Sequence, residues 1–304
     1  MLAGERMMGN NKRADNNKRA GNKKRMDDDK RVDNDVGMND DYKSFYDDWS
    51  RINIREYAKR KRLMYDKVDV LFDAIKRSGI NINGIKKIAE IGGAEGHILY
   101  GLGKKLKCKE MINYEIGATW RKICKKTYPN VIVRSEDVTA GGSGEDSERF
   151  DAIILSDIIE HIPDDDLFLK KISLRTRYIF VNLPLEDCIY LNMAKIVGRS
   201  PRLGIGIHPS GHVNLYNSGN GKRLLDKYFR EECSFVMEWG NTYLLKDFAK
   251  KRLTLKERAH KFLIKFTRNL GSWFYNRLWV TNLIYVGESK QKQYVKESKH
   301  AKKQ

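Results

Sequence analysis

The sequence predicts an α/β fold in which a doubly wound, mostly parallel sheet is covered by helices on both faces. The first observation is an alternation: five short apolar runs are separated by segments with helical spacing, as in successive βα units. The second is size, because 304 residues with 40% hydrophobic content can bury the core of a large domain. The third concerns membranes: no stretch approaches the roughly 18 uninterrupted apolar residues of a membrane-spanning helix, so we do not expect a transmembrane protein.

The elements of this fold follow one another along the chain. Apolar residues at a 3.6-type spacing from Tyr57 predict a helix that ends at Gly79. The predicted strands are 85–91, 110–114, 131–133, 152–155 and 178–182, with helices near 97–106, 118–127 and 165–172. A glycine-rich loop, a helix near 219–229, a strand at 234–239 and a last strand at 280–286 complete the series.

The composition changes at both ends of the predicted domain, which we place at 42–287. Residues 1–41 form a degenerate six-residue repeat with too few apolar side chains to offset the entropy of ordering, so we expect disorder there. A basic arm that binds nucleic acid is the alternative. Residues 288–304 are expected to be a flexible basic tail. The four cysteines lie far apart and the start lacks an apolar signal core, so we expect a reducing cytoplasm.

A glycine-rich turn follows the first predicted strand. In open α/β sheets the ligand lies at the carboxyl ends of the strands, so this turn is the place to look for a site. Ala94 and His97 stand where a dinucleotide fingerprint has its second and third glycines, which argues against a nicotinamide or flavin site. The turn reads Glu90-Ile91-Gly92-Gly93-Ala94-Glu95-Gly96-His97.

Acidic residues end the next three predicted strands. Glu115 follows the second strand, Asp137 the third and Asp157 the fourth. The carboxyl ends of parallel strands share one edge, so these side chains are expected to face the same crevice. A carboxylate after the second strand suits a ribose diol, because it accepts two hydroxyl hydrogen bonds and repels a phosphorylated ribose.

Together these segments resemble the class I S-adenosylmethionine-dependent methyltransferases, in particular the broad small-molecule group that includes ubiquinone-biosynthesis-type enzymes. The turn at 89–97 is similar to the family's first motif, although Ala94 replaces its central glycine. Residues 150–163, which read FDAIILSDIIEHIP, give the most specific match, and 178–184 and 211–216 resemble later segments. The resemblance implies a Rossmann-like seven-stranded sheet with a reversed last hairpin.

The resemblance also implies a cofactor, S-adenosylmethionine, with S-adenosylhomocysteine as its product. Gly92, Gly93 and Gly96 would approach the amino acid part of the cofactor. Glu115 would hold the ribose hydroxyls and Asp137 the adenine amino group. Residues Glu90 and Asp157 would line the methionine end. The ordinary alternatives are a tight turn for the glycines and helix capping for the acids.

Histidines near the site are candidates for acid–base work. His161 follows the fourth strand, and His208 and His212 lie in the glycine-rich loop. If the acceptor is a hydroxyl, His161 or His212 is the expected base. A structural role for His161 in its turn is the alternative. His208 and His212 would suit a metal pair, but the sequence reveals no third ligand, and we expect no metal site.

The segment 241–279 is predicted to be an insertion before the last strand. Within 255–279, apolar residues recur on one helical face while lysines and an arginine occupy others, which is typical of a helix at a membrane interface. A lid over the acceptor pocket is the alternative. The whole chain has a formal net charge of +19, and its last part, 243–304, contributes 16 basic and 4 acidic side chains, or +12. A basic segment of this density favours binding to an anionic surface.

These observations predict a methyltransferase that acts on oxygen of a small-molecule, sugar or lipid-linked acceptor, in the cytoplasm or at the inner face of the membrane. The basic ends leave an RNA methyltransferase as an alternative, although no RNA-binding module is recognised. A further alternative is a protein of this fold without turnover, associated with membrane or nucleic acid. The acceptor is inferred from the fold alone.

Overall fold

One seven-stranded sheet forms the centre of the protein in the computed structural model, which describes residues 61–139, 148–196, 212–239, 245, 249 and 252–291. Its strand order is β3-β2-β1-β4-β5-β7-β6. Strands β1 to β5 pair in parallel, and β7 is antiparallel to both β5 and β6. The bounds are β1 Lys87–Ile91, β2 Glu110–Tyr114, β3 Ile132–Arg134, β4 Phe150–Ser156, β5 Thr176–Leu185, β6 Phe229–Met237 and β7 Thr281–Ser289. This order confirms the predicted doubly wound sheet with a reversed last hairpin.

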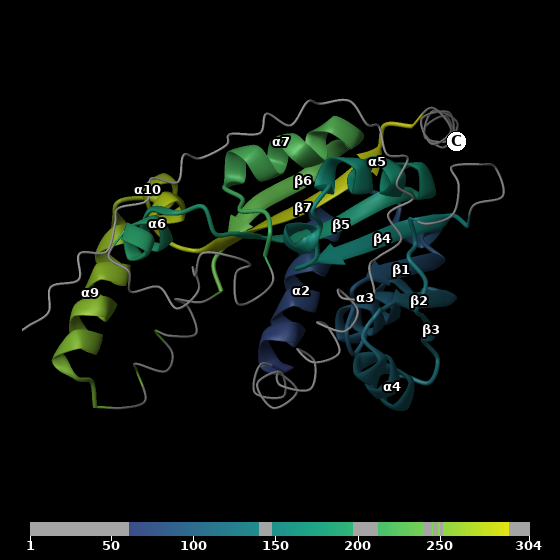
Figure 1. Ribbon diagram of the computed structural model, residues 1–304, viewed down its shortest axis with the longest axis horizontal. Helices are drawn as coiled ribbons and strands as arrows, with labels where there is room; N and C mark the ends of the chain where they lie inside the picture. Colours follow the sequence, from purple (N-terminus) through teal and green to yellow (C-terminus); the bar gives the residue numbers. More distant parts are fainter. Residues whose placement is uncertain are drawn as a thin grey trace, which may run out of the picture. The chain divides into compact units, whose positions relative to one another are not determined.

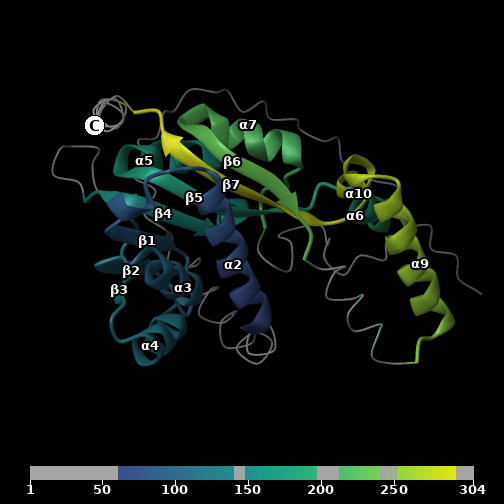
Figure 2. The same ribbon diagram turned by 180° about the vertical axis from the view of Figure 1, so that it is seen from behind.

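Helices cover both faces of the sheet (Figure 1). One face carries α2 (Lys61–Arg77), α3 (His97–Leu106) and α4 (Ala118–Thr127), and the other carries α5 (Asp165–Arg175) and α7 (Ser218–Tyr228). The view from behind shows the same two layers (Figure 2). Each layer buries its own apolar core: Leu71 and Leu99 lie in one, and Leu169 and Leu225 in the other. The core strands are thus apolar on both faces, as expected of parallel strands.

The predicted strands agree with the structure except near the end of the chain. The expected strand at 234–239 begins five residues earlier, at Phe229, and the helix before it ends at Tyr228. Phe229 is fully buried and pairs with Ser289, and the ladder continues across a bulge between Glu231 and Cys233. The charged run at 230–232 obscured this strand, because its side chains form ion pairs at a sheet edge instead of following an apolar pattern.

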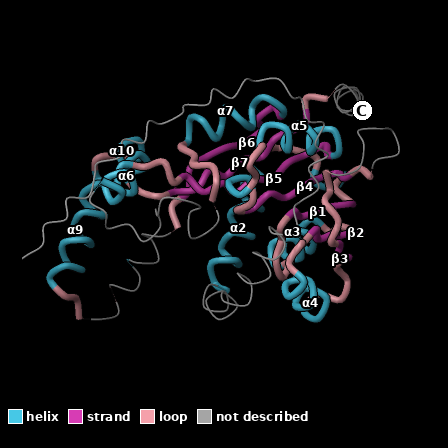
Figure 3. The backbone as a smooth tube through the Cα atoms, in the orientation of Figure 1, coloured by secondary structure: helices cyan, strands magenta, loops and turns pink. Residues whose placement is uncertain are grey.

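The insertion before β7 holds two helices where the sequence predicted one continuous face. Helix α9 (Leu255–Asn269) ends before Gly271, whose φ of 102° favours glycine, and α10 (Ser272–Leu278) begins after it. A small buried cluster joins the two helices: Ile264 of α9 packs with Tyr275 of α10 and with Trp279. The Trp279 indole donates a 2.9 Å hydrogen bond to Thr267 of α9. A short helix that the sequence did not reveal, α6 (Ile189–Ile196), contacts α10 (Figure 3).

The flexible tail predicted at 288–304 begins too early, because β7 continues through Ser289 and buries Glu288 and Ser289. Several predictions concern residues outside the described ranges, namely the repeat at 1–41, residues 292–304 of the tail, and Gly204, Gly206, His208 and Gly211 of the glycine-rich loop. Among the described residues, no helix combines the length and the apolar character needed to cross a membrane.

Candidate active site

The carboxyl edge of the sheet holds most of the predicted site residues. Strand β1 lies between β2 and β4, so the direction of winding reverses beside β1. This is the position at which open α/β sheets leave a crevice for a ligand. The turn after β1, Glu115 after β2 and Asp157 after β4 all lie at this edge. Asp137 follows β3, two strands away from β1.

The turn after β1 is left-handed at three alternate positions. The φ angles are 67° at Gly92, 46° at Ala94 and 77° at Gly96. A β-carbon on Gly92 would lie 2.6 Å from the Ile158 side chain, and one on Gly93 would lie 2.5 Å from the Asn113 amide oxygen. Glycine is therefore required at 92 by both conformation and space. Ala94 accepts a conformation that costs an ordinary residue roughly 1–2 kcal/mol.

Glu115 ties the glycine-rich turn to the end of β2. Its side chain is 6% exposed, and one carboxylate oxygen accepts a 2.8 Å hydrogen bond from the Ala94 N–H. The other oxygen accepts from the Gly117 N–H at 2.6 Å. Asn113 reaches the same turn by donating to the Ala94 carbonyl at 3.0 Å. The end of β2 thus binds both the N–H and the carbonyl of Ala94 and places the Glu115 carboxylate beside the turn.

Asp157 is positioned by groups from two elements, α2 and β5. It forms an ion pair with Lys67 of α2 and accepts a 2.9 Å hydrogen bond from the Asn182 amide of β5. Its own φ is 54°, a left-handed conformation that turns the chain sharply after β4. Lys67 is 5% exposed and was missed by the sequence analysis. The signal was present, because Lys67 lies four residues after Leu63 and four before Leu71 on the apolar stripe of its helix.

Glu90, the predicted methionine-side residue at the end of β1, is buried beneath the turn. Its carboxylate accepts a 3.0 Å hydrogen bond from the Leu99 N–H in the first turn of α3. Burial raises the pKa of Glu90 to about 8, and this hydrogen bond opposes the rise. A β-carbon on Gly93 would lie 2.7 Å from the Glu90 carboxylate, so the turn packs directly on this acid.

The Asp137 side chain is hydrogen-bonded to Thr139 in its own loop. Its carboxylate accepts a 2.7 Å hydrogen bond from the Thr139 N–H and a 2.9 Å bond from the Thr139 hydroxyl. These contacts are typical of a turn that caps its own backbone. The adenine contact expected of Asp137 stays a prediction.

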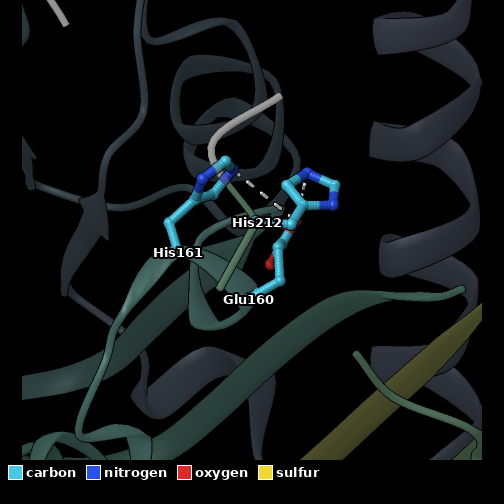
Figure 4. Close-up of side chains that lie close together, drawn as sticks. All are labelled: Glu160, His161 and His212. Atoms are coloured by element: carbon cyan, nitrogen blue, oxygen red, sulfur yellow. Dashed lines mark ion pairs between the residues drawn. The ribbon is translucent and has the colours of Figure 1, made fainter. Parts of the chain in front are cut away.

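Both predicted catalytic histidines lie beside Glu160, which the sequence analysis did not single out. The His161 and His212 rings meet edge to face with centroids 4.7 Å apart, and each Nε2 lies 3.9 Å from a Glu160 carboxylate oxygen (Figure 4). His212 Nδ1 lies 2.8 Å from the Glu186 carboxylate. Glu160 is fully buried, and burial together with the charge of Asp157 raises its pKa.

The backbone holds this histidine cluster together. The N–H groups of Val213 and Asn214 donate to the Glu160 carbonyl at 2.9 and 3.1 Å, and the Asn214 amide donates to the Ile162 carbonyl at 2.7 Å. These bonds join two segments about fifty residues apart in sequence, which explains why the sequence did not reveal the cluster. His208, the other histidine considered for a metal pair, lies outside the described residues.

Comparisons with known proteins found no match in sequence and structural neighbours of low identity. No protein-family model matches the sequence, and no curated protein matches it in sequence. Magnesium protoporphyrin IX methyltransferase from Synechocystis PCC 6803, solved with bound S-adenosylhomocysteine, is 13% identical over 81% of this chain and 94% of that chain, with a TM-score of 0.49. The N-methyltransferase NodS from Bradyrhizobium japonicum WM9, solved with the same compound, is 10% identical over 75% and 87%, with a TM-score of 0.44.

The order of the seven strands, with its antiparallel last hairpin, is the arrangement that the sequence resemblance implied. In fold, the chain resembles the class I methyltransferases. The function of this site is argued from its own residues below.

The burial of Glu90 predicts an effect of pH on stability. The folded protein retains the Glu90 proton up to about pH 8, whereas the ordinary pKa is 4.5. Between these values the folded state binds more protons than the unfolded state, so the Glu90 contribution to the free energy of unfolding falls as pH rises. Glu90→Gln cannot ionise, so this decline is expected to be absent in the variant.

Urea unfolding at about pH 5 and about pH 8 measures this effect. The free energy of unfolding of Glu90→Gln minus that of the wild type is the quantity compared. This difference is expected to be on the order of 1–4 kcal/mol more favourable to the variant at about pH 8 than at about pH 5. Glu136→Gln, which alters a carboxylate that is 60% exposed, is the matched control. Parallel pH profiles for the wild type and Glu90→Gln would contradict the burial of an ionisable Glu90.

Proposed function

We propose that this protein is an S-adenosylmethionine-dependent methyltransferase that acts on oxygen of a small-molecule, sugar or lipid-linked acceptor. The observation that carries the proposal is the buried carboxylate of Glu115 at the carboxyl end of β2, bonded to the glycine-rich turn through Ala94. A buried carboxylate at this place in a doubly wound sheet is the group that receives a ribose diol.

The chemistry of the surrounding groups is compatible with this cofactor. The two Glu115 oxygens accept backbone hydrogen bonds from Ala94 and Gly117, and a carboxylate oxygen can accept more than one hydrogen bond, as a ribose hydroxyl would require. The turn at 92–96 would receive the amino acid part, whose carboxylate suits the N-terminus of α3. Glu90 and Asp157 would lie toward the methionine end, where the Asp157 carboxylate would stabilise the cofactor's cationic groups. Asp137 would receive the adenine amino group.

The bound cofactor supplies a methyl group on a sulfonium sulfur, which is a good leaving group for in-line displacement. The protein's part is to align the acceptor oxygen with that methyl group and to exclude water. A hydroxyl acceptor loses its proton as its oxygen bonds to carbon, and His212 or His161 is the base that we assign to it. The 2.8 Å contact from His212 Nδ1 to Glu186 supports this role, since it fixes the orientation of the ring.

Calorimetric titration with S-adenosylmethionine, S-adenosylhomocysteine and a nicotinamide dinucleotide tests the proposal. The first two are expected to bind at micromolar concentrations and the dinucleotide is not. Glu115→Ala is expected to weaken binding of S-adenosylhomocysteine by roughly 5- to 150-fold, equivalent to about 1–3 kcal/mol.

Two further variants make this titration specific. Glu115→Gln retains an oxygen for the Ala94 N–H and is expected to weaken binding less than Glu115→Ala. Glu110→Ala removes an acid from the opposite end of β2 and is expected to leave affinity unchanged. Unaltered affinity in Glu115→Ala, or no binding by the wild type, would contradict the proposal.

We further propose that α9 and α10 contact the surface of an anionic membrane. Phe262 is 68% exposed, Phe266 48% and Trp273 73%, so these large side chains are not packed as the underside of a lid. Seven arginines and lysines and one glutamate lie within 252–279. Exposed aromatic residues beside a basic helix are typical of an interfacial segment, and a lipid-linked acceptor would be reached from such a surface.

Co-sedimentation with vesicles tests this contact. The protein is expected to bind vesicles that contain about one third phosphatidylserine, and to bind less as salt rises. Combined replacement of Phe262, Phe266 and Trp273 by Ser is expected to abolish binding without lowering thermal stability, since the side chains are exposed. Ile132→Ser, at an exposed position of β3, is the matched control. Retained vesicle binding, or loss of stability in the triple variant, would favour a lid packed on the core.

A further inference from the structure

Glu160, His161 and His212 form the most compact group of metal-ligating side chains within the described residues. One ligand atom from each lies within 4.8 Å of the others. Glu160 and His161 belong to the short 3-10 turn at Ile159–His161 after β4, and His212 begins the described segment before α7. Figure 4 shows the three side chains close together, with dashed lines for the ion pairs that link the histidines to Glu160.

Among the described residues, Glu160 is the one carboxylate that is buried without a hydrogen bond to another residue. Its side chain is 1% exposed, and neither oxygen has a hydrogen-bond partner within the part of the chain that the structure describes. Both histidine Nε2 atoms lie 3.9 Å away, beyond hydrogen-bond distance. A buried carboxylate without partners is costly, and ligation of a cation is one way to satisfy it.

The spacing of these atoms suits one ion. Ligand atoms about 2.1 Å from a tetrahedral centre lie roughly 3.4 Å from one another. The three ligand atoms here lie within 4.8 Å of one another, so relative movements of up to about 1.4 Å would bring Glu160 and both Nε2 atoms to one ion. The backbone bonds from Val213 and Asn214 to the Glu160 carbonyl already hold the two segments at this separation. The site is therefore largely formed without the ion.

Glu186 supplies the outer contact that metal-binding histidines commonly have. Its carboxylate is 8% exposed and lies 2.8 Å from His212 Nδ1. A proton on Nδ1 that is donated to Glu186 assigns Nε2 as the coordinating atom and fixes the ring toward Glu160. The pair of Glu186 and His212 distinguishes the cluster from two histidines that are neighbours by chance.

We propose that Glu160, His161 and His212 bind one divalent transition-metal ion of the zinc and manganese class, with Glu186 as the positioning residue for His212. Two imidazoles and one carboxylate are borderline ligands that suit such ions, and three protein ligands leave a coordination position for an oxygen of the acceptor. The metal site stands on its own geometry. Its role toward an acceptor hydroxyl rests on the proposed methyltransferase function. With the ion bound, that role replaces the base role of His161 or His212, because a coordinated Nε2 has no lone pair left to accept a proton.

Titration of the full chain with Co²⁺ tests the site. The protein is freed of any polyhistidine tag and of bound metal by a chelator, and the visible absorption of Co²⁺ and its calorimetric stoichiometry are recorded. One equivalent is expected to bind, with a spectrum typical of nitrogen and oxygen ligands, and Zn²⁺ is expected to displace it.

Matched variants assign the ligands. His161→Asn and His212→Asn are each expected to weaken Co²⁺ binding by at least about 100-fold, and Glu186→Gln by roughly 10- to 100-fold. His260→Asn, in α9, is expected to leave binding unchanged. Circular dichroism confirms that each variant is folded, and Glu160→Gln provides a second test of the carboxylate if a histidine variant does not fold.

The outcomes separate this proposal from the proposed function. The metal site would be overturned if the wild type does not bind one equivalent of Co²⁺. It would also be overturned if His260→Asn weakens Co²⁺ binding as much as His161→Asn and His212→Asn do. S-adenosylhomocysteine is titrated separately into the metal-free protein. Metal binding without cofactor binding would retain the metal site and contradict the methyltransferase proposal, and the reverse result would overturn the metal site alone.

Discussion

The burial of carboxyl groups at the carboxyl edge of the sheet governs the site. Glu90, Glu115, Glu160 and Glu186 are all buried there, each at or after the end of a strand. A carboxylate removed from water must be hydrogen-bonded, paired with a cation or protonated. Each of these solutions is used at this edge, and the differences among them divide the edge into a cofactor side and a histidine side.

On the cofactor side the compensation comes from the chain itself. Backbone N–H groups of the left-handed turn and of α3 bind Glu115 and Glu90, and the buried ammonium group of Lys67 pairs with Asp157. Helix α2 is therefore part of the site as well as a cover for the sheet. On the histidine side, Glu186 is paired with His212, whereas Glu160 has no hydrogen-bond partner among the described residues. That contrast points to a ligand that the chain does not provide.

The sequence was sufficient to locate elements and site residues where the local residue pattern reflects the fold. Buried parallel strands produce apolar runs, so the five parallel strands could be located, and the acids that follow them had to lie at one edge. Lys67 was missed although its place on an apolar helical stripe was visible, because its partner Asp157 lies 90 residues away in sequence. The pairing of Glu160 with His212 depends on segments about fifty residues apart, which no local period records. The start of β6 was missed because residues 230–232 form ion pairs at a sheet edge, and the break at Gly271 depends on one backbone angle.

The central claim is that the turn at 92–96 and Glu115 together receive an adenosine-containing cofactor. A crystal structure of the protein grown with S-adenosylhomocysteine tests this claim most directly. The account predicts ribose hydroxyls within about 3 Å of the Glu115 carboxylate, with the amino acid part of the ligand at the glycine-rich turn. A ligand bound elsewhere, or clear density for Glu115 without a ribose beside it at saturating concentration, would contradict the account.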